Sequence, residues 1–138
     1  PSPVTGRTKS TPLPVASRSA GGDTAGQMEK LGRARNNDES FQDAVGLLTR
    51  AIELDPNLAS AYNARGFAQL KMARFDPAIQ DFSEAIRLRS TYANAYHNRA
   101  VARRKKGDKA GAEEDERKAQ DLLSGIVSHP VAATTASR

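Results

Sequence analysis

The sequence predicts an all-α protein in which three antiparallel helical hairpins stack side by side. It is similar to itself at an offset of 34 residues, a period that is typical of stacked two-helix units. Each 34-residue unit contains two apolar patterns with helical spacing, separated by turn residues. Aromatic residues make up only 5% of the chain and hydrophobic residues 38%, which does not favour the large core of a β-sandwich or barrel.

The repeats cover residues 25–58, 59–92 and 93–126. In register, small residues share three positions and a bulky residue recurs near the start of each repeat. The small residues are Gly32, Gly66 and Ala100, then Ala44, Ala78 and Ala112, then Ala51, Ala85 and Ala119, and the bulky ones are Met28, Tyr62 and Tyr96. Small residues let two antiparallel helices approach closely, and each hairpin leaves an apolar face that the next one covers.

The first hairpin is predicted to consist of helices over 24–36 and 40–54. Asp55-Pro56-Asn57 ends its second helix, because the residue before a proline disfavours helical geometry. The second hairpin is predicted over 59–72 and 75–89. Its first helix places Tyr62, Gly66, Phe67 and Leu70 on one face, and Pro77 suits the first turn of its second helix.

The third hairpin is predicted over 93–106 and 109–127, with a turn at Lys106-Gly107-Asp108. Glu116 occupies the position that Leu48 and Phe82 hold in the other repeats. A charge there suits a face against which no further hairpin packs, although drift in a degenerate repeat would give the same pattern.

The segments that flank this domain, 24–127, differ from it in composition. Residues 1–23 and 128–138 are rich in Pro, Ser, Thr, Gly and Ala and show no apolar periodicity. Such segments bury too little surface to offset the entropy of ordering, so we expect a disordered N-terminal arm or linker and a disordered C-terminal tail.

Composition excludes several kinds of site. The absence of cysteine excludes a disulfide framework and a cysteine-ligated zinc site, and His97 and His129 are too few for a histidine cluster. We therefore expect no metal and no cofactor. The net charge of +5 is a mild excess that favours acidic partners. No apolar run reaches the roughly 18–20 residues of a membrane span. The sequence leaves the compartment open, either cytoplasmic or, if a signal peptide has been removed, exported or periplasmic.

The period and the residue types together resemble the tetratricopeptide repeat (TPR) family over residues 25–126. The resemblance is carried by Tyr62, Gly66, Ala78, Phe82 and Ala85, and in the first repeat by Leu31-Gly32, Ala44, Ala51 and Pro56. Arg65 and Arg99 stand where the family usually has leucine, Arg35, Gln69 and Arg103 where it has tyrosine, and Ser90 where it has the closing proline.

The resemblance implies a right-handed superhelix, an α-solenoid with a concave face lined by the first helix of each hairpin. The family holds an extended peptide or a short helix of a partner in that groove and has no catalytic residues of its own. We therefore expect a non-catalytic protein–protein interaction scaffold or adaptor.

Helical spacing assigns the groove face of each first helix. The expected groove residues are Glu29, Arg33, Asn36 and Asn37 in the first repeat, Asn63, Phe67, Leu70 and Lys71 in the second, and Asn94, His97, Val101, Arg104 and Lys105 in the third. The asparagines, with Asn98 beside them, suit a peptide backbone, and the cations suit carboxylates. Phe67 and Val101 offer an apolar anchor point. Together they favour an extended, acidic or carboxylate-ended peptide, and the alternative is an ordinary solvated helix face.

One subgroup of the family clamps the terminal carboxylate of heat-shock chaperones with lysine, asparagine and arginine at set positions. Here those positions hold Glu29, Arg33, Ala64, Asn94 and Asn98. None of them matches the clamp, so chaperone-tail binding is not expected.

Two other functions are open alternatives. Leu122, Leu123 and Ile126, with Val127, form an apolar strip on the last helix that either folds onto the third hairpin or packs on a second copy in a homodimer. The cluster Arg103-Arg104-Lys105-Lys106, with Arg33 and Lys71, is the best feature for nucleic-acid binding, which we consider less favoured.

Overall fold

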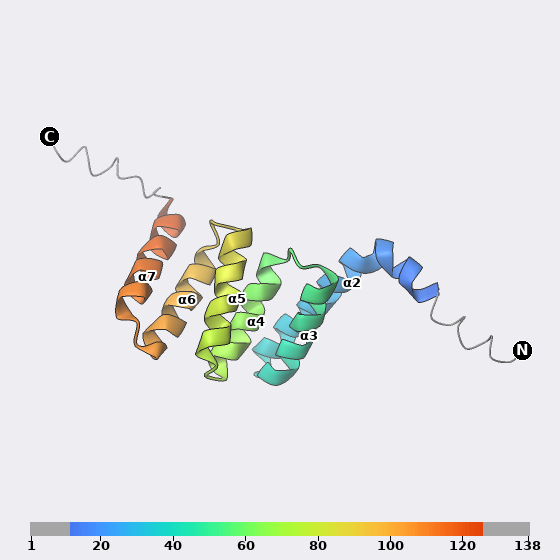
Figure 1. Cartoon of the computed structure of the whole chain (residues 1–138), viewed down its shortest axis with the longest axis horizontal. Helices are drawn as coiled ribbons and strands as arrows, with labels where there is room; N and C mark the ends of the chain where they lie inside the picture. The colour runs from blue at the N-terminus through green and yellow to red at the C-terminus, as the bar shows by residue number, and fades with distance from the viewer. Residues whose placement is uncertain (1–11, 126–138) are drawn as a thin grey trace, which may run out of the picture.

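The computed structural model describes residues 12–125, with side chains for 24–125. Within this range the chain forms six helices and no strand: α2 (Pro12–Asn37), α3 (Phe41–Leu54), α4 (Ala59–Lys71), α5 (Phe75–Leu88), α6 (Ala93–Lys106) and α7 (Lys109–Ser124). They pair as three hairpins that lie in a row, with α2 at one end and α7 at the other (Figure 1). The predicted all-α class with three stacked hairpins is confirmed.

The inner helix boundaries lie within one residue of the predicted ones, but the outer boundaries differ. α2 begins at Pro12 rather than at residue 24, and α7 ends at Ser124 rather than at 127. Figure 1 shows the first turns of α2 projecting beyond α3, away from the other helices. Pro12 suits a first helical position because its missing N–H is not needed there, whereas apolar periodicity gave no signal for a helix in this segment.

Residues 12–23, which were expected to belong to a disordered arm, are thus drawn as part of α2. Residues 1–11 and 126–138 lie outside the described range, and the division into arm, repeats and tail stays a prediction. Gly125 takes a left-handed conformation with φ 78° directly after α7, the usual place for a helix-ending glycine. None of the described helices is both long and apolar enough to cross a membrane.

The core is built mostly from alanine. Ala44, Leu48 and Ala51 of α3 pack against Ala61, Ala64 and Ala68 of α4, which joins the first hairpin to the second. Ala78 and Phe82 of α5 pack against Ala102 of α6, which joins the second to the third. Leu48 and Phe82 are the largest fully buried side chains of the described residues, and each lies against a glycine, Gly32 or Gly66.

The third hairpin replaces this glycine–bulky pair with Ala100 and Glu116. Glu116 is half-buried, and its Oε2 lies 3.1 Å from Nδ1 of His97 on α6. Leu48 and Phe82 belong to the clusters that join one hairpin to the next, whereas no described hairpin follows α7. That the charge marks the end of the array stays a prediction.

Ion pairs join the two helices of the second and third hairpins, and the arginine of each pair also donates a hydrogen bond to the preceding hairpin. Nε and Nη2 of Arg65 donate to both oxygens of Asp81 at 2.8 Å, and its Nη1 donates to Thr49 Oγ1 at 3.1 Å. Arg99 repeats these contacts with Asp115 and with Ser83 Oγ. The hydrogen-bonded carboxylate of Asp81 raises the pKa of Arg65, so this guanidinium stays charged. We call this arrangement the arginine staple.

The staple accounts for two departures from the family pattern. Each arginine stands where the family usually has leucine, and each is matched by an aspartate sixteen residues later. In the first repeat the same two positions hold Leu31 and Leu47, so an apolar pair replaces the ionic one. Each staple arginine also reaches a hydroxyl on the preceding hairpin, and so it helps to set the angle between neighbours.

The turn inside each hairpin uses one conformation three times. Glu39, Ala73 and Gly107, each 34 residues apart, have φ of 64°, 62° and 98°. The amide after each donates to a carbonyl in the last turn of the preceding helix, as in Ser40 N to Arg35 O at 2.8 Å. This is the hydrogen-bond pattern of a Schellman motif, which ends a helix with a left-handed residue.

Candidate functional site

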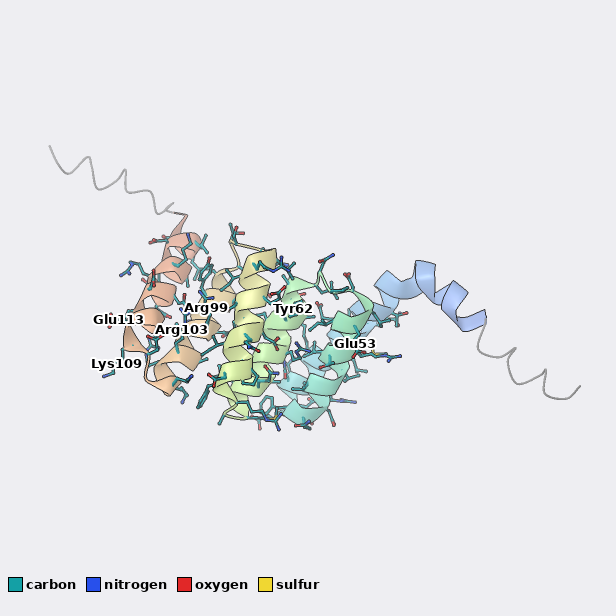
Figure 2. The ribbon with its side chains drawn as sticks, viewed as in Figure 1. Glu53, Tyr62, Arg99, Arg103, Lys109 and Glu113 are labelled. Carbon is teal, nitrogen blue, oxygen red and sulfur yellow. The ribbon has the colours of Figure 1, made fainter. Side chains whose placement is uncertain are left out.

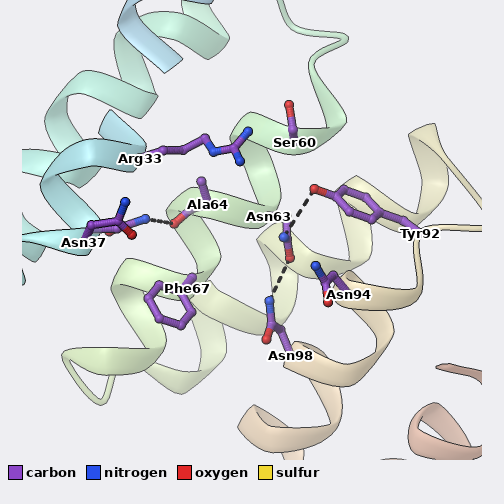
Figure 3. Close-up of a pocket in the computed structure, with 10 residues that line it drawn as sticks. Arg33, Asn37, Ser60, Asn63, Ala64, Phe67, Tyr92, Asn94 and Asn98 are labelled. Atoms are coloured by element: carbon purple, nitrogen blue, oxygen red, sulfur yellow. Dashed lines mark hydrogen bonds between the residues drawn. The ribbon is translucent and has the colours of Figure 1, made fainter. Parts of the chain in front are cut away.

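Two adjoining hollows lie along the face that α2, α4 and α6 form together. The first, which we call the amide hollow, has a volume of about 380 Å³. It is lined by Arg33, Asn36, Asn37, Ser60, Asn63, Ala64, Phe67, Tyr92, Asn94 and Asn98 (Figure 3). The second, the apolar hollow, has a volume of about 410 Å³ and is lined by Phe67, Leu70, Lys71, Ala73, Phe75, His97, Asn98, Val101 and Lys105. Both include Phe67 and Asn98, so the two hollows adjoin, and together we call them the groove.

The repeat architecture explains why these side chains meet. On each first helix the lining residues are three or four positions apart, as in Asn63 and Phe67, or Asn94, Asn98 and Val101. Such residues share one face of a helix. The buried alanines of the same helices, such as Ala68 and Ala102, face the neighbouring hairpin instead.

A chain of hydrogen bonds crosses the amide hollow. Nδ2 of Asn98 donates to Oδ1 of Asn63 at 3.1 Å, and Nδ2 of Asn63 donates to the hydroxyl of Tyr92 at 3.3 Å (Figure 3). Neither Asn37 nor Asn94 makes a side-chain hydrogen bond to another described residue. The hollow therefore offers amide donors and acceptors that a ligand can use.

Asn36 lies at the base of the same hollow and is only 8% exposed. Its Nδ2 donates to the backbone oxygen of Ala64 at 3.0 Å, which fastens α2 to α4. Its Oδ1 is buried and has no hydrogen-bond partner among the described residues. A buried acceptor without a partner is costly, so Asn36 contributes to the groove mainly by fastening α2 to α4.

The apolar hollow combines aliphatic and aromatic walls with cations. Leu70, Phe75 and Val101 line it together with the ring of Phe67, while Lys71 and Lys105 are exposed. Nζ of Lys71 lies 5.7 Å from the centroid of the Phe67 ring, within the range of a cation–π contact. No aspartate or glutamate lines either hollow, so the local charge favours an acidic ligand.

Figure 2 shows the same helices with their side chains. It places Arg99 and Arg103 near α6 and α7, with Lys109 and Glu113 at the outer side of α7. Nη1 of Arg103 donates to Asp115 at 2.8 Å, and Nζ of Lys106 contacts Asp76 at 2.5 Å. Half of the basic cluster 103–106 is therefore neutralised within the protein.

The structure brings most of the predicted groove residues together. Those that line a hollow are Arg33, Asn36, Asn37, Asn63, Phe67, Leu70, Lys71, Asn94, His97, Val101 and Lys105. Glu29 lies at the edge, where it accepts a hydrogen bond from Ser60 Oγ and its Oε1 is 3.8 Å from Arg33 Nη1. Arg104 is exposed on α6 and lines neither hollow. Their part in binding stays a prediction.

The sequence analysis missed three polar or aromatic residues that line the groove. Phe75 is the first residue of α5, Tyr92 directly precedes α6, and Ser60 lies in the first turn of α4. Phe75 and Tyr92 lie outside the first helices, whereas Ser60 lies three residues before the predicted Asn63 on α4 and was not assigned to its groove face. In the described part of the chain, no group of three or more His, Cys, Asp or Glu side chains is placed to hold a metal ion.

Comparison with known proteins agrees with this geometry. The sequence profile described as "Tetratricopeptide repeat" matches residues 59–92, which are the second hairpin. The chain belongs to the tetratricopeptide repeat family. Tetratricopeptide repeat protein 36 of Mus musculus is 37% identical over 100 residues, which cover 65% of this chain and 54% of that protein. Hsc70-interacting protein 1 of Drosophila melanogaster is 34% identical over 100 residues, which cover 72% of this chain.

Solved TPR domains share the whole hairpin array. The second TPR of Spaghetti (RPAP3) bound to the HSP90 peptide SRMEEVD superposes with a TM-score of 0.71 at 26% identity, covering 73% of this chain and 94% of that one. The Arabidopsis OM64 TPR domain gives a TM-score of 0.73 at 28% identity, covering 74% and 84%.

The TPR chain spans only part of its relatives, 26% of the length of each Drosophila Hsc70-interacting protein. Proteins of the TPR family are typically non-enzymatic interaction scaffolds. The names of the relatives describe partners of those proteins.

Proposed function

We propose that this TPR protein binds an extended segment of a partner protein along the groove formed by the amide and apolar hollows. The observation that carries the proposal is the amide hollow, where Asn37, Asn94 and Asn98 line one space that no carboxylate lines. An extended peptide has unpaired backbone N–H and C=O groups, and side-chain amides donate and accept in the same way.

The charges of the groove favour an acidic segment. Arg33, Lys71 and Lys105 line the two hollows, and no carboxylate lines them. Charge complementarity of this kind steers association and excludes basic partners. The positions that clamp a chaperone tail in one TPR subgroup hold Glu29, Ala64 and Asn94 here, so the proposed ligand differs from the HSP90 peptide of the structural neighbour.

Peptide selection tests the proposal without knowledge of the natural partner. A random peptide library is selected on the immobilised protein, and the selected peptides are measured by isothermal titration calorimetry. Alanine at Asn63 and Asn98 is expected to weaken binding about tenfold, the effect of losing roughly one hydrogen bond in a desolvated site. Gln80→Ala, an exposed position on α5 outside both hollows, serves as control. Equal affinity of the wild-type protein and all three variants would refute the groove assignment.

Self-association is a second candidate, favoured by one observation on α7. Leu123 is 77% exposed, and Leu122 beside it is half-buried. Ile126, the third residue of the expected strip, lies outside the described residues. Sedimentation velocity at several concentrations, compared with Leu123→Ser, tests a homodimer, and a mass independent of concentration rejects it.

A further inference from the structure

The two hollows differ in chemistry, and the difference indicates what kind of segment they select. The amide hollow carries one guanidinium, Arg33, which lies 3.8 Å from the carboxylate of Glu29. The apolar hollow carries two exposed lysines, Lys71 and Lys105, and none of the described residues forms an ion pair with either within 4 Å. The unneutralised positive charge is therefore concentrated around the apolar walls.

The walls of the apolar hollow suit one large side chain. Leu70 and Phe67 come from α4, Val101 from α6, and Phe75 from the start of α5. All four are half-buried, so a ligand side chain can remove further apolar surface from water. His97 also lines the hollow, but its Nδ1 faces Glu116 at 3.1 Å. The nearby cations that remain for a ligand are the two lysines.

We propose that the groove recognises an internal segment in which an aliphatic side chain, flanked by aspartate or glutamate, enters the apolar hollow. This inference rests on the proposed function and names its ligand class. The aliphatic side chain packs between α4 and α6, and the flanking carboxylates pair with Lys71 and Lys105. The backbone continues over the amide hollow, where neutral asparagines favour peptide groups over a terminal carboxylate.

Four synthetic peptides test the ligand class directly. The reference peptide, SSDLDSS, has an acetylated N-terminus and an amidated C-terminus, so it carries no terminal charge. SSDSDSS removes the aliphatic anchor, SSNLNSS removes the carboxylates, and a fourth peptide has the reference sequence with a free C-terminal carboxylate. Dissociation constants come from NMR titration of the ¹⁵N-labelled protein, which also shows whether the amides of Val101 and Lys105 respond.

The reference peptide is expected to bind about tenfold more tightly than SSDSDSS, because its leucine removes apolar surface from water. Its affinity is expected to be roughly fivefold higher than that of SSNLNSS at low salt, and this difference in affinity should shrink as added salt screens the exposed lysines. Lys105→Glu should remove this second difference, whereas Arg50→Glu, the same charge change at an exposed position on α3, should leave it unchanged.

Three results would overturn the inference. Equal binding of all four peptides would show that neither the anchor nor the carboxylates are read, and tighter binding of the free-carboxylate peptide would assign the groove to chain ends. Displacement of the reference peptide by a uridine decamer would assign the lysines to nucleic acid. In the first two cases the proposed function stands if alanine at Asn63 or Asn98 still weakens binding, so the two failures can be told apart.

Discussion

Gly66 on α4 lies directly against the ring of Phe82 on α5, so closely that a Cβ at position 66 would be 2.7 Å from Phe82 Cε1. The ring is fully buried and cannot move toward solvent. We expect Gly66→Ala to lower the free energy of unfolding by about 1–3 kcal/mol, because overpacking outweighs the better helix propensity of alanine. Chemical denaturation followed by circular dichroism measures the change.

Gly46→Ala is the matched control for this prediction. Gly46 lies in α3, and a Cβ there would meet nothing within 4 Å. Alanine should raise the free energy of unfolding by about 0.5–1 kcal/mol, through reduced backbone entropy alone. Destabilisation at both glycines would show that the contact with Phe82 is not the cause.

The left-handed turn at Ala73 predicts a stabilising substitution. Ala73 has φ 62°, a conformation that glycine adopts without cost and that Gly107 holds in the third hairpin. Ala73→Gly should raise the free energy of unfolding by about 0.5–1 kcal/mol. The same change at Ala110, an exposed position in α7, should lower it by a similar amount. The prediction fails if both substitutions act in the same direction.

The arginine staple predicts that replacing one partner of the ion pair destabilises the protein more than replacing both. Asp81→Leu leaves Arg65 without its carboxylate, and only 20% of that arginine side chain is exposed. The loss is expected to be about 2–4 kcal/mol, since a largely buried charge is left unpaired. The double change Arg65→Leu with Asp81→Leu reproduces the Leu31 and Leu47 pair of the first repeat and should recover most of this stability. A double variant as unstable as the single one would contradict the assignment.

Lys71 and Arg104 separate the groove from the surface beside it. Both were predicted to contact the ligand, but only Lys71 lines a hollow. Lys71→Glu is expected to weaken binding of library-selected acidic peptides about tenfold, and Arg104→Glu by no more than about twofold, which long-range charge accounts for. Isothermal titration calorimetry at two salt concentrations measures both. Larger loss at Arg104 would place the ligand outside the two hollows.

Much of the fold could be predicted because the 34-residue register is present in the residues themselves. Gly66 occupies the repeat position of Gly32, and Phe82 that of Leu48. A bulky side chain can pack against a glycine in this way only where the two helices lie side by side. The part of α2 before residue 24 could not be predicted, because its sequence shows no apolar periodicity. Pro12 suits the start of a helix, but no second sequence feature marks a helix there.

The helix faces that line the groove could be predicted from the sequence, but the full set of lining residues could not. Helical spacing placed Asn63, Phe67 and Val101 correctly on the lined face. Phe75 and Tyr92 enter from the ends of other elements, and their positions depend on how far each hairpin rotates against the next. That rotation is not encoded in the period. The aspartate sixteen residues after each staple arginine could have been recognised as its partner, since the interval occurs twice.

The hydroxyl groups that accept hydrogen bonds from the staple arginines affect where the array can gain a further hairpin. Residues 59–92 contain both groups of this contact. Arg65 donates a hydrogen bond to the preceding hairpin, and Ser83 accepts one from the arginine of the next hairpin. A duplicated copy of this segment, inserted beside the original, would find its donor and acceptor already in place. After α7 the receiving position holds Arg117, so a copy added there would bring two cations face to face. Gene duplication could therefore lengthen the array at its middle far more readily than after α7.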